Sequence, residues 1–145
     1  MPTVADVLAV KGEQVHSVSP DTTVLDTIRK MNQHKIGALL VMERGQVVGI
    51  FTERDVLRRV VGMERSPAEM KVADVMTADV ICVEPEADLD DVATIMKEKK
   101  IRHVPVCDNE GRVQGMISIG DVNAYHATHQ EATIHFLNEY IYGRA

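Results

Sequence analysis

Two stretches of the chain, residues 24–31 and 89–96, carry apolar side chains at the spacing of one helix face. Each stretch follows a β-rich segment closed by a proline, and each precedes two short apolar runs separated by a turn. The helices are expected to begin at N-terminal caps, which are Thr23 with Asp26 and Asp88 with Asp91. The pattern therefore predicts a β-α-β-β order that occurs twice.

Each half is expected to contain three strands at equivalent positions. They are residues 14–19, 38–42 and 46–51 in the first half, and residues 79–84, 103–107 and 113–117 in the second. Gly45 and the turn at residues 109–111 are expected to close the two hairpins. Each half opens with a short segment, residues 4–8 or 72–76.

Two further helical segments are expected outside the strands. Between the halves, Ser66 and Glu69 have the spacing of a capping box for a short helical turn. Beyond residue 121 an amphipathic helix is expected to run toward Tyr140 and to stop at Gly143. Its apolar face consists of Phe136, Leu137, Tyr140 and Ile141.

A duplicated motif ends each half and marks an internal repeat. Residues 49–55 and 115–121 both read Gly, two apolar residues, a hydroxyl residue, two variable positions and Asp. Earlier in the halves, residues 4–7 return as residues 72–75. The agreement in order and spacing predicts two copies of one structural unit.

The motif has the chemistry of a strand that turns into a helix. Thr52 or Ser118 would be the N-cap, and Asp55 or Asp121 the third helical residue. Backbone N–H groups at a helix start attract anions, and a carboxylate can accept hydrogen bonds from a sugar diol. Capping alone would also explain either copy, so both interpretations stay open.

Composition narrows the function without naming it. The chain has 145 residues, is 45% hydrophobic, contains no Trp and carries a formal net charge of −6. An acidic chain is a poor match for general nucleic-acid binding, although a local basic site could still hold a small anion. Cys82 and Cys107 fall in expected strands and are interpreted as buried free thiols.

The sequence lacks the motifs of secretion, membrane insertion and common catalytic sites. The N-terminus does not have the pattern of a signal peptide, and no apolar run is long enough to span a bilayer, so a cytoplasmic location is expected. Neither a nucleophile elbow nor an HExxH, Walker or GxGxxG motif is present. We therefore expect neither an enzyme nor a metal site.

The doubled β-α-β-β-α plan resembles a tandem cystathionine-β-synthase (CBS) domain pair, or Bateman module. The repeated motif at residues 49–55 and 115–121 and the segment of residues 101–106 also match the pattern of that family. The resemblance covers roughly residues 4–124 and implies a stand-alone α/β (α+β) module of two pseudo-twofold repeats packed sheet to sheet. The expected divisions are residues 1–62 for repeat 1, 63–71 for the connector, 72–125 for repeat 2, and 126–145 for a C-terminal helix.

The resemblance implies clefts between the repeats that bind adenine nucleotides or other adenosyl ligands. AMP, ADP or ATP is the expected regulatory ligand, with S-adenosylmethionine or NAD(H) as alternatives, and no cofactor is required. The resemblance implies that the ribose is bound by Asp55 and Asp121 and the phosphate by Thr52, Ser118 and Arg54. Two basic residues that precede the second hairpin, Arg102 and His103, are also expected to contact phosphate. The base is expected to contact the backbone of His16, Ser17, Ser19, Val80 and Ile81.

The two copies differ where charge matters. Gly37-Ala38 stands in the first half where Arg102-His103 stands in the second, and Gly120 stands where the first half has Arg54. Two unequal clefts are expected. The function expected is an energy-sensing regulator that signals its occupancy to a partner protein and forms a homodimer through its helices and C-terminal helix. The alternative is a structural dimerisation scaffold with empty clefts.

Overall fold

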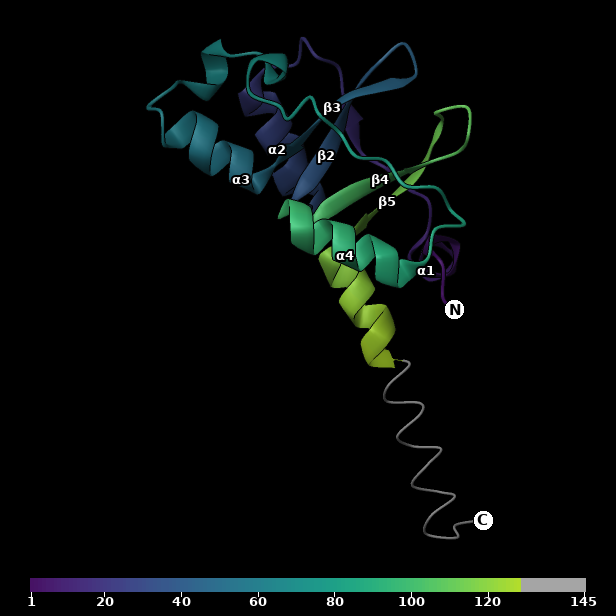
Figure 1. Ribbon diagram of the computed structural model, residues 1–145. Helices are drawn as coiled ribbons and strands as arrows, with labels where there is room; N and C mark the ends of the chain where they lie inside the picture. The colour runs from purple at the N-terminus through teal and green to yellow at the C-terminus, as the bar shows by residue number, and fades with distance from the viewer. Residues whose placement is uncertain (129–145) are drawn as a thin grey trace, which may run out of the picture.

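The computed structural model describes residues 1–128, and Figure 1 shows how their helices and strands are arranged. The first half contains α1 (Val4–Lys11), β1 (Ser17–Val18), α2 (Val24–His34), β2 (Ala38–Glu43), β3 (Gln46–Thr52) and α3 (Glu53–Asp55). The second half contains α4 (Leu89–Lys99), β4 (His103–Cys107) and β5 (Val113–Ser118), and residues 119–128 are again helical. The mixed helix and strand content confirms the α+β class.

Both long helices begin at the expected caps. The Thr23 side chain accepts a hydrogen bond from the Asp26 backbone N–H at 3.1 Å. The Asp88 side chain caps α4 through the N–H of Asp90 at 2.8 Å, so Asp91 is not the cap partner that the sequence suggested. Each helix ends at a lysine in the left-handed conformation.

The hairpins follow from their turn residues. Arg44 and Gly45 both have positive φ angles, of 52° and 76°, and this two-residue turn joins β2 to β3 in the conformation that fits the twist of a hairpin. In the second hairpin the Asp108 carboxylate accepts the N–H groups of Glu110 and Arg112, each at 2.9 Å. Gly111 completes that turn at a φ of 82°.

Within residues 1–128 the strands form two sheets, with orders β1-β2-β3 and β4-β5. The expected strand over residues 79–84 does not form, and Val83 makes only an isolated parallel bridge to Val106. The reason is Pro105. In the first repeat the corresponding Leu40 donates its N–H to the His16 carbonyl at 3.1 Å, but proline has no N–H to offer.

The opening segments cross over between the repeats. The Val4 N–H donates to the Ala87 carbonyl of the second repeat at 3.0 Å, and the Val72 N–H donates to the Thr22 carbonyl of the first at 2.8 Å. The buried residues form two clusters, and each cluster combines one repeat with the opening segment of the other. Val4, Val7 and Leu8 therefore belong to the core of the second repeat, and Val72 and Val75 to that of the first.

The glycine that opens each motif makes room for this exchange. A Cβ atom at Gly115 would lie 2.8 Å from Leu8 Cδ2, and one at Gly49 would lie 2.3 Å from Met76 Sδ. Leu8 and Met76 belong to the two crossed opening segments. The motif glycines thus leave the space into which these side chains of the other repeat's opening segment pack.

Several local expectations need correction or lie outside the described part. Pro67–Glu69 is a 3₁₀ turn, but Ser66 makes no side-chain cap, so the capping box predicted there is wrong. Cys107 is buried, whereas Cys82 is exposed because its segment does not join a sheet. The chain toward Tyr140, with its apolar face and Gly143, lies outside the described residues. Among residues 1–128, we find no helix with the length and hydropathy needed to span a membrane.

Candidate functional site

Both motifs form the predicted capping boxes. Asp55 Oδ2 accepts the Thr52 N–H at 3.0 Å, while Thr52 Oγ1 accepts the Asp55 N–H at 3.3 Å. In the second copy, Asp121 Oδ2 accepts the Ser118 N–H at 2.8 Å, and Ser118 Oγ accepts the Asp121 N–H at 3.1 Å. The helix-start interpretation of both motifs is confirmed.

The backbone N–H groups at these helix starts are largely occupied. Besides the capped Asp55 N–H, the Glu53 N–H donates to the Gly37 carbonyl at 3.0 Å. The Ile119 N–H donates to the Arg102 carbonyl at 2.8 Å in the corresponding place. An anion bound here would therefore depend on side chains more than on the helix N-terminus, contrary to the emphasis drawn from the sequence.

Arginine side chains follow the first motif on a widened helix. After α3 the chain continues as a π-helical segment, Val56–Val61, in which the Gly62 N–H bonds to the Leu57 carbonyl at 2.8 Å. π-Helical turns are uncommon and are frequent at functional sites. This segment carries Arg58 and Arg59 into the wall of a cavity that also contains the motif.

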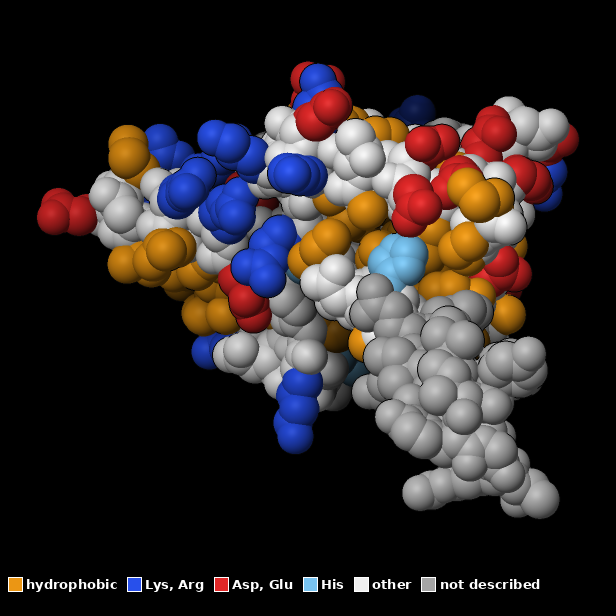
Figure 2. All heavy atoms as spheres, turned by 60° about the horizontal axis from the view of Figure 1, so that its bottom comes forward, with side chains coloured by type: hydrophobic (Ala, Val, Ile, Leu, Met, Phe, Trp, Pro, Cys, Tyr) orange, Lys and Arg blue, Asp and Glu red, His pale blue; other side chains and the backbone are white. Residues whose placement is uncertain are grey.

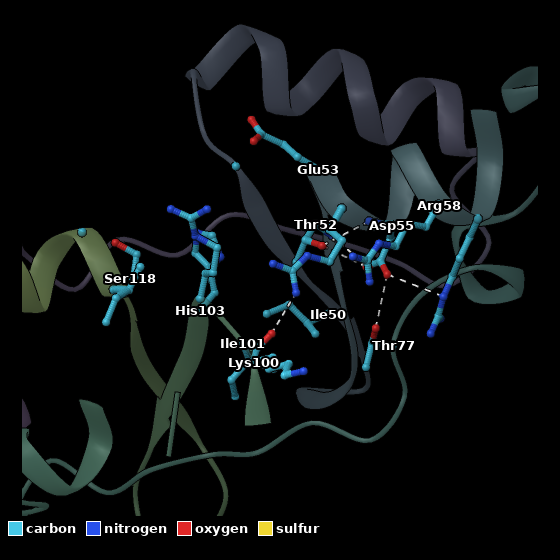
Figure 3. Close-up of a pocket in the computed structure, with 16 residues that line it drawn as sticks. Ile50, Thr52, Glu53, Asp55, Arg58, Thr77, Lys100, Ile101, His103 and Ser118 are labelled. Carbon is cyan, nitrogen blue, oxygen red and sulfur yellow. Dashed lines mark hydrogen bonds and ion pairs between the residues drawn. The ribbon is translucent and has the colours of Figure 1, made fainter. Parts of the chain in front are cut away.

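The cavity has a volume of about 550 Å³ and lies where the two repeats meet (Figure 3). This volume is within the range of small-molecule sites. In Figure 3, Thr52, Asp55 and Thr77 lie together, with His103 and Ser118 on the opposite side of the view. The lining comprises Gly37, Ile50, Thr52, Glu53, Arg54, Asp55, Arg58, Arg59, Thr77, Lys100, Ile101, Arg102, His103, Ser118, Ile119 and Gly120.

The lining is basic although the chain as a whole is acidic. Figure 2 shows Lys and Arg side chains gathered on the side of the molecule that carries α3, and Asp and Glu side chains on the other side. The only acidic residues among the lining are Glu53 and Asp55. The basic members are Arg54, Arg58, Arg59, Lys100 and Arg102. A cavity with this excess of positive charge favours an anionic ligand.

Hydrogen bonds tie the cavity wall to both repeats. Arg54 donates to the Lys100 carbonyl at the end of α4, at 2.8 Å. The Thr77 hydroxyl donates to Asp55 Oδ1 at 3.4 Å, and Arg59 Nε lies 3.7 Å from the same oxygen. The Asp55 carboxylate is therefore buried, hydrogen-bonded and still part of the cavity lining.

The structure brings together half of the residues predicted for the site. Six of them line the cavity: Thr52, Arg54, Asp55, Arg102, His103 and Ser118. The other six do not line it: Asp121, His16, Ser17, Ser19, Val80 and Ile81.

The five residues whose backbone was expected to recognise a base do not line this cavity, and their role in base recognition stays a prediction. The His16 ring stacks on His34 with the ring centroids 4.0 Å apart, and the Ser17 carbonyl accepts Lys30 Nζ at 2.5 Å. The Ser19 hydroxyl lies 3.1 Å from that of Thr22. Val80 and Ile81 follow Thr77, the nearest preceding residue that does line the cavity.

Sequence reasoning missed Thr77, Arg58, Arg59 and Lys100. Thr77 comes from the segment that crosses to the first repeat, and no local pattern indicates that pairing. A signal did exist for the arginines, because Arg58 and Arg59 follow Arg54 and Asp55 by one helical turn.

Two titratable groups near the cavity have displaced pKa values. Burial lowers the pKa of His103 below its ordinary value of 6.5; Lys11 and Arg102 lower it further, while Asp121 and Glu53 oppose the shift. Burial would raise the pKa of Asp121, but hydrogen bonds from Lys11 and Ser118 and the charge of Lys11 hold it below its ordinary value. Within residues 1–128, no group of three potential metal ligands is present.

Comparison with known proteins agrees with this architecture. The CBS domain model matches residues 4–62 and 72–127, which is most of the chain. The chain belongs to the CBS-domain family. A CBS-domain pair is a regulatory module, so this chain is one.

The relatives and solved structures cover nearly all of the same region. The mitochondrial CBS domain-containing protein CBSX3 of Arabidopsis thaliana is 37% identical, and the match covers 97% of this chain and 72% of that protein. A putative signal-transduction protein with CBS domains from Burkholderia ambifaria is 41% identical with a TM-score of 0.80, covering 83% of this chain and 90% of that one. The CBS domain pair of protein MJ0100, solved with 5′-methylthioadenosine and S-adenosylmethionine, has a TM-score of 0.78 at 22% identity, covering 88% and 98%.

Proposed function

We propose that the chain binds an adenine nucleotide of the AMP, ADP or ATP type in the cavity around Asp55. The observation that carries this proposal is that the Thr52–Asp55 capping box and five basic residues line one cavity of about 550 Å³. Asp55 Oδ1 would accept ribose hydroxyls, because its hydrogen bond from the Thr77 hydroxyl is long, at 3.4 Å, whereas Oδ2 accepts the Thr52 N–H at 3.0 Å. The arginines of the wall supply the donors that phosphate oxygens require.

The fold neighbour that holds adenosyl ligands supports the adenosine part of the proposal only as an analogy, because its identity to this chain is low. The basic lining supports the phosphate part independently of any relative. A ligand with both a sugar diol and several phosphate oxygens would match both the Asp55 carboxylate and the basic residues of the lining. ADP and ATP are therefore favoured over S-adenosylmethionine, which carries no phosphate.

The experiment is a thermal-shift screen against AMP, ADP, ATP, NADH and S-adenosylmethionine. A ligand that binds the folded state raises the melting temperature by mass action. Asp55→Asn should abolish the shift, because it removes the negative charge while keeping an acceptor for the Thr52 N–H. Asp6→Asn is the matched control, since Asp6 accepts the Thr3 N–H at 2.8 Å in a capping box away from the cavity.

The outcome decides between the two functions under consideration. An unchanged melting temperature with every ligand at millimolar concentration would favour the structural scaffold. A shift that survives Asp55→Asn would place the ligand elsewhere.

Signalling and assembly extend the proposal. Ligand phosphates would compete with the Lys100 carbonyl for Arg54, and this competition would shift the end of α4 relative to the first repeat.

We further propose homodimer formation through the π-helical segment, where Leu57 and Val61 are 66% and 61% exposed. Sedimentation of the wild type against Leu57→Glu checks the dimer. A cytoplasmic location stays a prediction, since the Arabidopsis relative is named as mitochondrial.

A further inference from the structure

The two motif carboxylates have different partners, although their capping boxes are alike. In the first repeat Thr77 is the partner: its N–H donates to the Ile50 carbonyl at 2.9 Å, and its hydroxyl donates to Asp55 Oδ1 at 3.4 Å. The hydrogen-bond partner of this carboxylate is thus a neutral hydroxyl, and its ion-pair partner is the guanidinium group of Arg59. Arg59 approaches the same oxygen only at 3.7 Å and itself lines the cavity.

In the second repeat the ammonium group of Lys11 occupies the corresponding place. Lys11 Nζ lies 2.6 Å from Asp121 Oδ2 and 2.6 Å from the Met116 carbonyl. Met116 precedes Ser118 by two residues, as Ile50 precedes Thr52. One lysine therefore makes the two contacts that the N–H and the hydroxyl of Thr77 make in the first repeat.

The difference follows from the lengths of the opening helices. The opening helix that belongs to the second repeat in sequence, Val72–Asp74, is a single 3₁₀ turn that packs on the first repeat. The chain is therefore already extended when it reaches Thr77, and Thr77 pairs with Ile50 of β3. The opening helix that belongs to the first repeat in sequence, α1, packs on the second repeat and continues to Lys11, so the backbone of Lys11 remains helical. Only the long side chain at the end of α1 can reach the strand carbonyl and the carboxylate.

The second half-site, defined by the Met116 carbonyl, Ser118 and Asp121, also lacks the arginines of the first. Three and four residues after Asp55 the chain has Arg58 and Arg59, whereas Ala124 and Tyr125 stand at those positions after Asp121. The cavity lining includes Ser118, Ile119 and Gly120 but stops short of Asp121. The Asp121 carboxylate is thus paired with Lys11 and is not followed by the two arginines that follow Asp55.

We propose that the ammonium group of Lys11 acts as a cation supplied by the chain itself and closes the second half-site. The chain would then bind one nucleotide, at Asp55. The single-nucleotide stoichiometry rests on the proposed function, whereas the closure by Lys11 does not. Removing the ammonium group frees the Asp121 carboxylate to accept a sugar diol. Because Ala124 and Tyr125 stand where the first repeat has Arg58 and Arg59, the ligand class that the opened half-site would take is an uncharged nucleoside.

The test uses equilibrium dialysis to measure how many molecules of labelled adenosine bind per chain in the presence of saturating ADP. Wild-type protein should bind one ADP and no adenosine. Lys11→Met should bind one additional adenosine per chain, and Lys11→Met combined with Asp121→Ala should lose it. Lys71→Met is the matched control, because Lys71 forms an exposed ion pair with Asp21 at 3.3 Å that lies away from both motifs.

The results separate this inference from the proposed function. Equal adenosine binding by wild type and Lys11→Met, whether none or one, would overturn the closure by Lys11 even if ADP binds as proposed. Weaker ADP binding by Lys11→Met would instead make Lys11 a ligand contact and also overturn it. An adenosine site that opens in a protein without ADP affinity would support the closure and reject the proposed function. Lys11→Gln, with a thermal melt, repeats the test should Lys11→Met fold poorly.

Discussion

The contact between Gly115 and Leu8 allows a quantitative test of the exchange between repeats. A Cβ at position 115 would lie 2.8 Å from Leu8 Cδ2 and 3.3 Å from Cδ1, and Leu8 is only 5% exposed. Gly115→Ala should destabilise the protein by about 1–3 kcal/mol through overpacking, less about 0.4–1 kcal/mol gained from a stiffer unfolded chain. Leu8→Ala alone should cost about 2–5 kcal/mol, because it removes buried atoms and leaves a cavity.

The two substitutions should compensate when combined. The added methyl group at position 115 would fill part of the space left by Leu8→Ala, so the double variant should be more stable than the sum of the single variants by about 1–2 kcal/mol. Urea unfolding followed by far-UV circular dichroism measures all three values, a suitable probe for a chain without Trp. Val7→Ala is the control partner, because the nearest atoms to position 115 all belong to Leu8.

Additivity within about 0.5 kcal/mol for the Leu8 pair would refute the reasoning, because it would mean that α1 does not pack on β5 through this contact. A compensation of equal size with Val7→Ala would refute it too, since the effect would then be a general loosening of the core.

Three further outcomes are expected. Arg58→Ala or Arg59→Ala should weaken ADP binding by about 10- to 150-fold in calorimetry, since a hydrogen bond to a charged group contributes about 1.5–3 kcal/mol. The lowered pKa of His103 means that the unfolded chain takes up the proton first; the free energy of unfolding should therefore fall as pH drops below 6.5, and His103→Gln should reduce that fall. Thr52→Ala should lower the free energy of unfolding by about 1 kcal/mol through loss of the cap, and Thr52→Ser should restore it.

Each of these outcomes has a control and a contrary result. Arg29→Ala removes an exposed arginine outside the cavity and should leave ADP affinity unchanged; an equal loss there would indicate a long-range charge effect. A pH dependence of unfolding that is unaffected by His103→Gln would assign the titration to other groups. If Thr52→Ser were as unstable as Thr52→Ala, the hydroxyl would not be the source of the stability.

Local chemistry explains which features could be predicted from the sequence. The caps at Thr23, Thr52 and Ser118 and the turn at Gly45 depend on neighbouring residues, so their patterns were sufficient. The apolar face of residues 4–8 was also visible, but periodicity does not show which core a face joins.

Apart from the local cap details at Asp91 and Ser66, the errors arose where residues distant in the sequence decide the outcome. The strand predicted over residues 79–84 needed an N–H that Pro105 lacks, although its own composition is β-rich. In the same way, Thr77 reaches Asp55 and Lys11 reaches Asp121 only through the crossed opening segments. Of the residues predicted for the two clefts, six therefore line one basic cavity, whereas Asp121 is paired with Lys11.

The exchange of opening segments makes the chain equivalent to a covalently fused dimer of half-length units. A single unit could complete its core only by taking the opening segment of a second copy, and the connector converts that intermolecular exchange into an intramolecular one. Two fragments cut within the connector should therefore reassemble on mixing, while each alone should stay largely unfolded. A shortened connector should return the exchange to neighbouring chains and yield domain-swapped oligomers whose population rises with protein concentration.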